Sequence, residues 1–469
     1  MIADLKPYAE YKELGLPWLG RVPGHWDVKK PRHIGSLTKG IGGTKEDAVS
    51  AGVPCVRYGE LYTTHTFFVR KPKAFVHPDR ASDYTPLHYG DVLFAASGET
   101  LEEIGKSAVN LIEGTAVCGG DVIILRPTVP VHAPFLGYLM DCRPSAIQKA
   151  MMGRGTTVKH IYPDELKQLL FPFPPVSEQA AIVRFLDWAN GRLERAIRAK
   201  RKVIALLGEQ KQAIIHRAVT RGLDPSVPLK PSGIPWLGDI PQHWGVVRNL
   251  ALFSHRVEKG IPGLPVLQVS LHSGITAEEL DQFGRPKRLI ADHTKYKLIR
   301  KHDLAYNTMR MWQGAVGVCP TDGLVSPAYV VIRPRPGTDP TFYEFVFRTA
   351  VYKQEVNRHS TGIVSDRNRL YWESFKQMPN VLLPIDDQHE ICRFIQEETG
   401  GLNTAISRLE REIELLREYR TRLVADVVTG TLDVREAAAR LPDEAAADIA
   451  EDDTDLSDET EPADEEATV

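Results

Sequence analysis

Two stretches of the chain place an apolar residue at every third or fourth position over about 44 residues, longer than most helices of globular domains. This spacing is a heptad stripe, the seam along which helices pack into a coiled coil. The stripes are Ile182, Leu186, Ala189, Leu193, Ala196, Val203, Leu207 and Ile214, and then Ile395, Leu402, Ile406, Leu409, Ile413, Leu416, Leu423 and Val427. We therefore predict one long helix over 177–222 and another over 386–434.

Opposite net charges indicate that the two predicted helices pair with each other. Residues 177–221 carry 10 basic and 4 acidic side chains, whereas residues 386–430 carry 6 basic and 10 acidic ones. Self-pairing would set like charges together, while pairing of one stretch with the other sets opposite charges together. We expect an intramolecular antiparallel coiled coil; the alternative is that each stripe packs on its own domain.

The region that precedes each predicted helix has a different pattern. Short β-rich runs, such as those at 91–95, 121–125, 266–269 and 329–332, are separated by Gly, Pro, Asn and Asp. Such runs with turn residues between them are typical of strands. We expect two mixed α/β domains.

An internal duplication frames both regions. Residues 15–20 read Gly-Leu-Pro-Trp-Leu-Gly and recur as Gly-Ile-Pro-Trp-Leu-Gly at 233–238, and a Pro-x-His-Trp segment follows each copy. At the start of the long helices, Gln179 recurs as Gln388. The ends of the two halves are alike and their middles differ. This pattern indicates two similar frames that carry two different recognition regions.

These patterns predict an α+β fold, in which two similar mixed α/β domains are joined by two long helices that form an antiparallel coiled coil. The predicted segments are a frame segment at 1–26, the first mixed domain at 27–176, the first helix at 177–222, a linker with the second frame at 223–244, the second mixed domain at 245–385, the second helix at 386–434, and an acidic disordered tail at 435–469.

Composition adds a charge asymmetry to this picture. The 469 residues suit two to four domains. The last 29 residues contain 13 acidic side chains and no Lys or Arg, so the remaining chain holds 58 basic against 48 acidic residues. A basic body of this kind suits a polyanionic partner. Five scattered cysteines without a CxxC pair, no signal peptide and no run of about 18 apolar residues favour the cytoplasm.

Motifs of catalysis and metal binding are incomplete. The segment ending in Gly105-Lys106-Ser107 has Thr100 where a phosphate-binding loop needs its first glycine. There is no HExxH helix, no GxSxG elbow and no Asn-Pro-Pro-aromatic motif. We expect no catalytic residue, no metal site and no cofactor in this chain.

Side chains that suit DNA recognition are frequent in both middle regions. Arg reads guanine and Asn or Gln reads adenine through the major groove, while Lys and Arg neutralise phosphate. The candidate DNA-binding residues are Arg57, Lys71, Lys73, Arg80, Arg154, Thr156, Thr157 and Lys159 in the first region, and Arg285, Lys287, Arg288, Asn307, Arg310, Gln313, Arg358, Arg367, Asn368 and Arg369 in the second. For any one of them a solvated surface residue is the alternative interpretation.

Taken together, the sequence resembles the specificity subunits of type I restriction-modification enzymes over nearly all of residues 11–434. The resemblance rests on the duplicated frames, the paired helices, Gly-Thr-Thr-Val at 155–158 and Pro-Pro-Val-Ser-Glu-Gln at 174–179. The second half departs from this pattern, with Thr-Gly-Ile-Val at 361–364 and Pro-Ile-Asp-Asp-Gln at 384–388.

This resemblance implies a function. Each middle region would be a target recognition domain that reads one half of a bipartite, asymmetric DNA sequence, with the coiled coil as spacer. The chain itself would be non-catalytic. It would bind double-stranded DNA, two modification subunits that use S-adenosylmethionine to methylate adenine, and restriction subunits that use ATP and Mg²⁺.

Two other classes of function remain open at this stage. One is a coiled-coil adaptor that joins proteins and does not recognise DNA. The other is a stand-alone DNA-modifying enzyme with an unfamiliar site, which the missing motifs disfavour.

Overall fold

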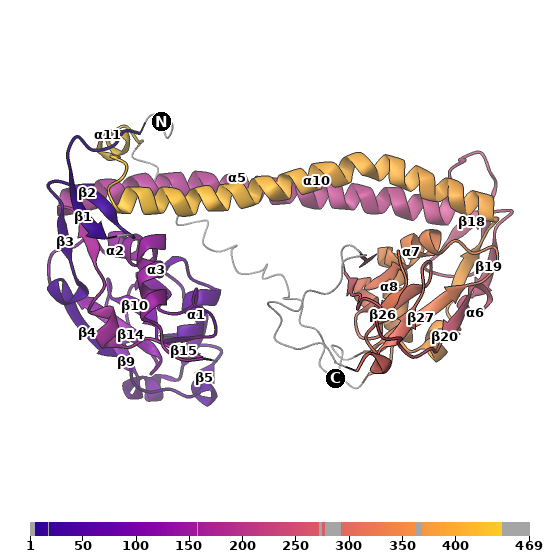
Figure 1. The fold of residues 1–469 in the computed structure, drawn as a ribbon, viewed down its shortest axis with the longest axis horizontal. Helices are drawn as coiled ribbons and strands as arrows, with labels where there is room; N and C mark the ends of the chain where they lie inside the picture. Colours follow the sequence, from indigo (N-terminus) through magenta and orange to yellow (C-terminus); the bar gives the residue numbers. More distant parts are fainter. Residues whose placement is uncertain are drawn as a thin grey trace. The chain divides into compact units, whose positions relative to one another are not determined.

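The computed structural model describes residues 5–442 apart from 17, 157, 272–273, 277–291 and 363–367. The chain divides into two compact units (Figure 1). Among the described residues, the first unit comprises everything up to Lys200 together with the residues from Arg411 onward, and the second comprises residues 201–410. Each unit therefore contains one sheet-bearing domain and part of both long helices.

Two five-stranded sheets form the domain of the first unit. Neighbouring strands are antiparallel except in the pairs β12–β7 and β13–β6. In spatial order, the first sheet consists of β4 (Gly35–Lys39), β14 (Val122–Pro127), β10 (Val92–Ala95), β12 (Ser107–Asn110) and β7 (Phe67–Val69). The second consists of β5 (Ala48–Val49), β8 (Ala74–Val76), β6 (Val53–Val56), β13 (Ala116–Cys118) and β9 (Thr85–Leu87).

The domain of the second unit repeats the first of these sheets in shorter form. Its main sheet has four strands in the order β20 (Phe253–Arg256), β27 (Tyr329–Pro334), β24 (Leu304–Asn307) and β25 (Val316–Val318). Two strand pairs accompany it: β23 (Lys297–Ile299) with β26 (Gly323–Val325), and β21 (Val269–Ser270) with β22 (Gly274–Ile275).

Short helices and strand pairs complete the two units. The first unit has α1 (Tyr58–Thr63), α2 (Ala133–Asp141), α3 (Arg143–Met152), α4 (Pro163–Leu166) and α11 (Arg435–Ala439), and the second has α6 (Asn249–Leu252), α7 (Pro340–Arg348), α8 (Ala350–His359) and α9 (Trp372–Phe375). The strand pairs are β1 (Tyr11–Leu16) with β2 (Gly20–Pro23), β3 (Asp27–Lys29) with β16 (Phe171–Phe173), β11 (Ser97–Gly98) with β15 (Lys159–His160), β17 (Leu229–Pro231) with β18 (Asp239–Pro241), and β19 (Gly245–Arg248) with β28 (Pro379–Leu382). The 3-10 helices are η2 (Pro31–His33), η3 (Lys45–Asp47), η4 (Pro78–Asp83), η5 (His293–Lys295) and η6 (Met311–Gln313).

The two long helices predicted from the heptad stripes are confirmed. They are α5 (Val176–Arg221, 46 residues) and α10 (Ile385–Val428, 44 residues), and Figure 1 shows them side by side. Side-chain contacts run in opposite directions along them, as an antiparallel pair requires. Lys200 Nζ lies 2.6 Å from Glu412 and Arg420 lies 3.1 Å from Glu194 in the first unit, and in the second Lys211 donates to Asn403.

The structure differs from the sequence prediction after α10. This helix ends at Val428, because Gly430 has a left-handed backbone (φ +80°) and a Cβ there would lie 2.4 Å from Pro23. The predicted tail at 435–469 begins with an ordered segment, in which Ala437, Ala438 and Leu441 of α11 and its C-terminal end are buried. Burial of these apolar side chains orders the segment. Residues 443–469 lie outside the described part.

Each long helix has a buried glutamine in its first turn, and the contacts of this glutamine explain why it recurs in both halves of the sequence. Gln179 accepts a hydrogen bond from His132 N, before α2, and donates to Pro174 O. Gln388 accepts from Asp339 N, before α7, and donates to Leu383 O. Both side chains are fully buried. Each satisfies backbone groups that would otherwise be buried without partners, so the same residue is required twice.

The repeated tryptophans pair with the residue just before each glutamine. Trp26 Nε1 donates to Glu178 at 2.9 Å, and Trp244 Nε1 contacts Asp387 at 3.3 Å. The preceding histidines contact the same carboxylates, His25 at 2.6 Å in the first unit. This pairing fastens each Pro-x-His-Trp segment to the start of a long helix.

The glutamine contacts generate a stability prediction. Gln179→Ala and Gln388→Ala should each lower the free energy of unfolding by about 1–3 kcal/mol, because each leaves buried backbone groups unpaired. The measurement is urea unfolding of the full chain. Gln212→Ala removes an exposed glutamine of α5 and serves as the control for helix propensity. Unfolding free energies equal to that of the control would contradict the prediction.

Candidate nucleic-acid interface

Both units build a polar corner at the same place in the fold. In each unit, the backbone carbonyl of the residue that follows a central strand (β10 or β24) accepts a hydrogen bond. The donor is a backbone N–H in the segment that leads into a one-turn helix (α4 or α9). Ile161 N donates to Ala96 O at 3.0 Å in the first unit, and Leu370 N donates to Thr308 O at 2.8 Å in the second. We define the first corner as Ser97, Arg154, Lys159, His160 and Tyr162, and the second corner as Thr308, Arg310, Gln313, Arg369 and Tyr371.

A short hairpin holds the first corner together. Arg154 and His160 exchange backbone hydrogen bonds of 2.9 and 2.7 Å, and Ser97 Oγ lies 2.9 Å from His160 Nδ1. Gly155 makes the hairpin possible, because its backbone is left-handed (φ +116°) and a Cβ would lie 2.1 Å from Val158 O. The hairpin therefore requires glycine at the first position of the Gly-Thr-Thr-Val segment.

Of the two cations of the first corner, Arg154 projects into solvent and Lys159 is half-buried. The side chain of Arg154 is 74% exposed although it contacts Glu165 at 2.8 Å, and Lys159 Nζ donates to Gly155 O. Thr156 is exposed beside them. The Glu165 side chain is only 16% exposed, so this ion pair is open to solvent on the arginine side alone.

The second corner has an equivalent pair of backbone hydrogen bonds but different side chains. Thr361 and Arg369 exchange backbone hydrogen bonds of 3.0 Å, and Arg369 is exposed. Arg310 precedes η6, which contains Gln313, and both side chains are half-buried. The side chain of Asn307 makes a local hydrogen bond just before this turn, because its Oδ1 accepts from Met309 N.

The remaining sequence-predicted residues lie around these corners or elsewhere. Asn368 donates to Asn357, and Arg358 of α8 contacts Glu355 at 3.2 Å. Four residues of the first unit lie around its second sheet instead: Arg57 before α1, Lys71 and Lys73 between β7 and β8, and Arg80 in η4, which contacts Asp47 and Asp83. Thr157, Arg285, Lys287, Arg288 and Arg367 lie outside the described residues.

Each corner also contains an exposed tyrosine that the sequence patterns did not single out. Tyr162 is 49% exposed and Tyr371 48%, and each immediately precedes a one-turn helix, α4 or α9. They stand at equal distances before Gln179 and Gln388, so alignment of the two halves on the glutamines would have found them. Their equal exposure at equal places makes them candidates for contact with a ligand.

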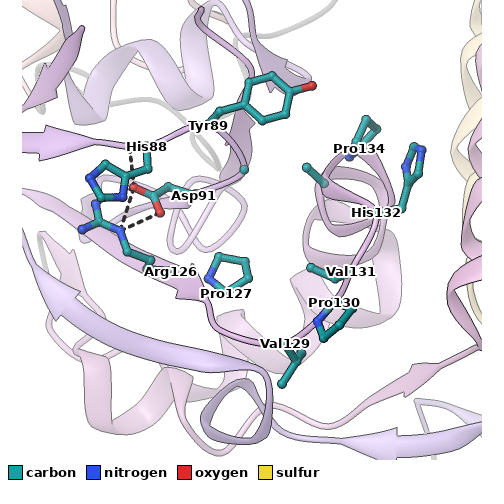
Figure 2. Close-up of a pocket in the computed structure, with 12 residues that line it drawn as sticks. His88, Tyr89, Asp91, Arg126, Pro127, Val129, Pro130, Val131, His132 and Pro134 are labelled. Atoms are coloured by element: carbon teal, nitrogen blue, oxygen red, sulfur yellow. Dashed lines mark hydrogen bonds and ion pairs between the residues drawn. The ribbon is translucent and has the colours of Figure 1, made fainter. Parts of the chain in front are cut away.

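A hollow of about 610 Å³ opens elsewhere in the first unit, between the start of β10, the end of β14 and the start of α2 (Figure 2). Its cation, Arg126, makes a two-pronged contact with Asp91 and also donates to Pro86 O. Burial lowers the pKa of His132, on the opposite wall, and so favours its neutral form. Because Arg126 is already paired, we assign no ligand to this hollow.

Potential metal ligands and thiols among the described residues are placed as follows. Among them, no group of three or more His, Cys, Asp or Glu side chains is placed to hold a metal ion. All five cysteines are buried and free, and burial raises the pKa of Cys55 to about 11. A thiol with so high a pKa is a poor nucleophile. Within the described residues, no helix combines the length and apolarity that a membrane crossing requires.

Comparisons with known proteins agree with the duplicated architecture. No protein-family model matches the chain. The chain is 21% identical over 437 residues to a putative type I restriction enzyme specificity subunit (MjaX) of Methanocaldococcus jannaschii, covering 89% of this chain and 96% of the relative. It is also 21% identical over 445 residues to the EcoKI specificity subunit of Escherichia coli K12, covering 88% and 90%.

A solved structure shares the fold. It comes from a study of complex assembly and conformational transition in the type I R-M system, with a TM-score of 0.60, 16% identity, and coverage of 87% of this chain and 98% of the other. The chain is therefore similar to curated type I restriction enzyme specificity subunits along nearly its whole length, and it shares the fold of a solved structure from the type I R-M system.

Proposed function

We propose that this chain reads a bipartite, asymmetric DNA target for a type I restriction-modification complex, one half-site per unit. The observation that carries the proposal is the corner, which is built twice on one frame with different side chains. Arg154, Lys159 and His160 occupy the first, whereas Arg310, Gln313 and Arg369 occupy the second. Arginine pairs with guanine and glutamine with adenine, so the two corners suit different sequences.

The surrounding charge supports DNA as the ligand. The second middle region, residues 245–383, carries 19 basic and 12 acidic side chains, and the first, residues 27–170, carries 17 and 15. Basic side chains beside a base-reading corner neutralise phosphate and position the protein on the duplex.

We further propose that the paired helices set the gap between the half-sites. A helix of 44 residues is about 66 Å long at 1.5 Å per residue. At about 3.4 Å per base pair, that length corresponds to at most about 19 base pairs.

The proposed complex supplies the chemistry that this chain does not. Two modification subunits would bring S-adenosylmethionine and methylate adenine, and restriction subunits would bring ATP and Mg²⁺. The chain would be their non-catalytic recognition subunit and act in the cytoplasm. The repeated frame supports two copies of one partner, because it offers the same residues twice.

A methylation map of the source genome, with and without this gene, tests the proposed target. We expect deletion to abolish one adenine-methylated motif that is split and asymmetric, because the corners differ. Loss of a palindromic motif would contradict the asymmetry. If no motif changes, binding of DNA by the chain with its modification subunits decides between a recognition subunit and a protein-joining adaptor.

Lengthening the coiled coil tests the role of the helices. One heptad inserted into both helices, at the level of the Lys200–Glu412 contact, adds about 10.5 Å to each helix. We expect the gap in the methylated motif to grow by about 3 base pairs while the half-sites stay unchanged. If a folded, active variant methylates a motif with the original gap, the proposal that the paired helices set the gap is wrong.

Substitution of the corner arginines tests the reading surface. Arg154→Ala and Arg310→Ala should each weaken target binding by the complex by about 1–3 kcal/mol at fixed salt. Fluorescence anisotropy with labelled target DNA measures the effect. Arg32→Ala, which removes an exposed arginine of η2, is the matched control. Affinity equal to the control would remove that arginine from the interface.

A further inference from the structure

A cavity of about 430 Å³ opens beside the second corner. Its lining includes Thr308, Arg369 and Tyr371 of that corner, together with His255 of β20 and Trp372 of α9. Pockets that hold small organic ligands have volumes of about 300–1,000 Å³, so this cavity has room for one.

Aromatic rings form one side of the cavity. His255 and Trp372 are stacked, with centroids 5.3 Å apart and planes 23° apart, and the neighbouring Tyr371 is 48% exposed. Aromatic side chains at an open cavity suit a flat ring, and nucleobases stack on such side chains whatever their sequence.

Cations lie beside these rings. Lys297 and the exposed Arg369 both line the cavity. Lys297 Nζ donates to Tyr329 O at 2.6 Å, which uses one of its three donors. The acidic residue of the lining, Glu373, contacts Lys376, so its charge is already offset. The lining therefore favours an anionic ligand.

One polar atom of the lining is unsatisfied. Nε2 of His255 is buried and has no hydrogen-bond partner among the described residues. Burial, and then the nearby Lys297, lower the pKa of His255, so its ring is neutral near pH 7. A neutral imidazole nitrogen can donate to or accept from the edge of a base. Buried polar atoms ordinarily have partners, so this nitrogen is an exception among the described residues.

The first unit has Tyr162 at the place of Tyr371 but different neighbours. Alignment on the repeated tryptophans sets Leu37 opposite His255, and alignment on the glutamines sets Pro163 opposite Trp372. The stacked pair and its buried nitrogen therefore belong to the second unit.

We propose that this cavity binds one unstacked nucleotide, with its base against Tyr371 and Trp372 and its phosphate beside Lys297 and Arg369. The source of this nucleotide would be the half-site read by the second unit, from which one nucleotide is extruded. On this point the proposal rests on the proposed DNA function. Reading an extruded base gives that half-site a contact that groove recognition does not supply.

The test uses the full chain in complex with its modification subunits. Target DNA carries 2-aminopurine, whose fluorescence rises on unstacking, at successive positions of the half-site read by the second unit. The methylated adenine, which methyltransferases themselves extrude, is the positive control. We expect one further position to brighten. Tyr371→Leu and Trp372→Leu should abolish that signal and weaken binding about tenfold, because stacking is lost.

Two matched variants separate this role from folding. Arg32→Ala changes an exposed arginine of η2 outside both corners and should leave the new signal intact. Arg369→Gln removes an exposed charge beside the proposed phosphate and should weaken the signal. If the complex binds its target but no further position brightens, or if brightening survives both Tyr371→Leu and Trp372→Leu, no base from the strand enters the cavity.

A second arm identifies a free nucleotide as the source. The full chain and its Trp372→Leu variant are titrated with deoxynucleoside monophosphates, and tryptophan fluorescence is followed. Saturable quenching that the variant and Arg369→Gln both lose supports the site, with a free nucleotide as its ligand. Absence of both signals overturns the proposal. Failure of the complex to bind any DNA overturns the proposed function, and the titration alone then decides on the cavity.

Discussion

The hydrogen bonds of one buried glutamine in each unit hold the rest of the architecture in place. Gln179 and Gln388 each tie the first turn of a long helix to the backbone before a domain helix, α2 or α7. A buried backbone group without a partner costs about 1–3 kcal/mol, so no apolar residue can replace either glutamine without loss. The long helix and its domain are thereby joined at one point, and the tryptophan frame is fastened at the preceding residue, Glu178 or Asp387.

This constraint leaves the rest of each domain free to change. Each central strand is preceded by a buried aspartate, Asp91 or Asp303, that needs an arginine partner. In the first unit Arg126 of β14 supplies it, and in the second Arg256 of the edge strand β20 does. A buried carboxylate must be paired, but the cation can come from the adjacent strand, as in the first unit, or from the strand beyond it, as in the second. The same solution reached from two strands shows how far the domains have diverged on a common frame.

Divergence of the domains and constancy of the frame suit the proposed division of labour. In the proposed complex, the constant parts would offer equal contacts to two copies of one partner, while the two corners would present different side chains to two half-sites. The cavity beside Tyr371 extends this difference, because its stacked His255 and Trp372 have no counterparts in the first unit. Specificity would then depend on a few exposed side chains held by a rigid scaffold, as is common for binding sites on loops.

The sequence by itself determined the fold class, the duplication and the two long helices, because heptad periodicity and repeated letters are local or directly comparable signals. It also selected Arg154, Arg310 and Arg369, which the structure places in the corners. Only the tertiary structure showed that Tyr162 and Tyr371 are exposed, that α11 is ordered by burial, and that His255 meets Trp372. Those features depend on contacts between residues more than a hundred positions apart, or on exposure, and neither leaves a periodic signal along the chain.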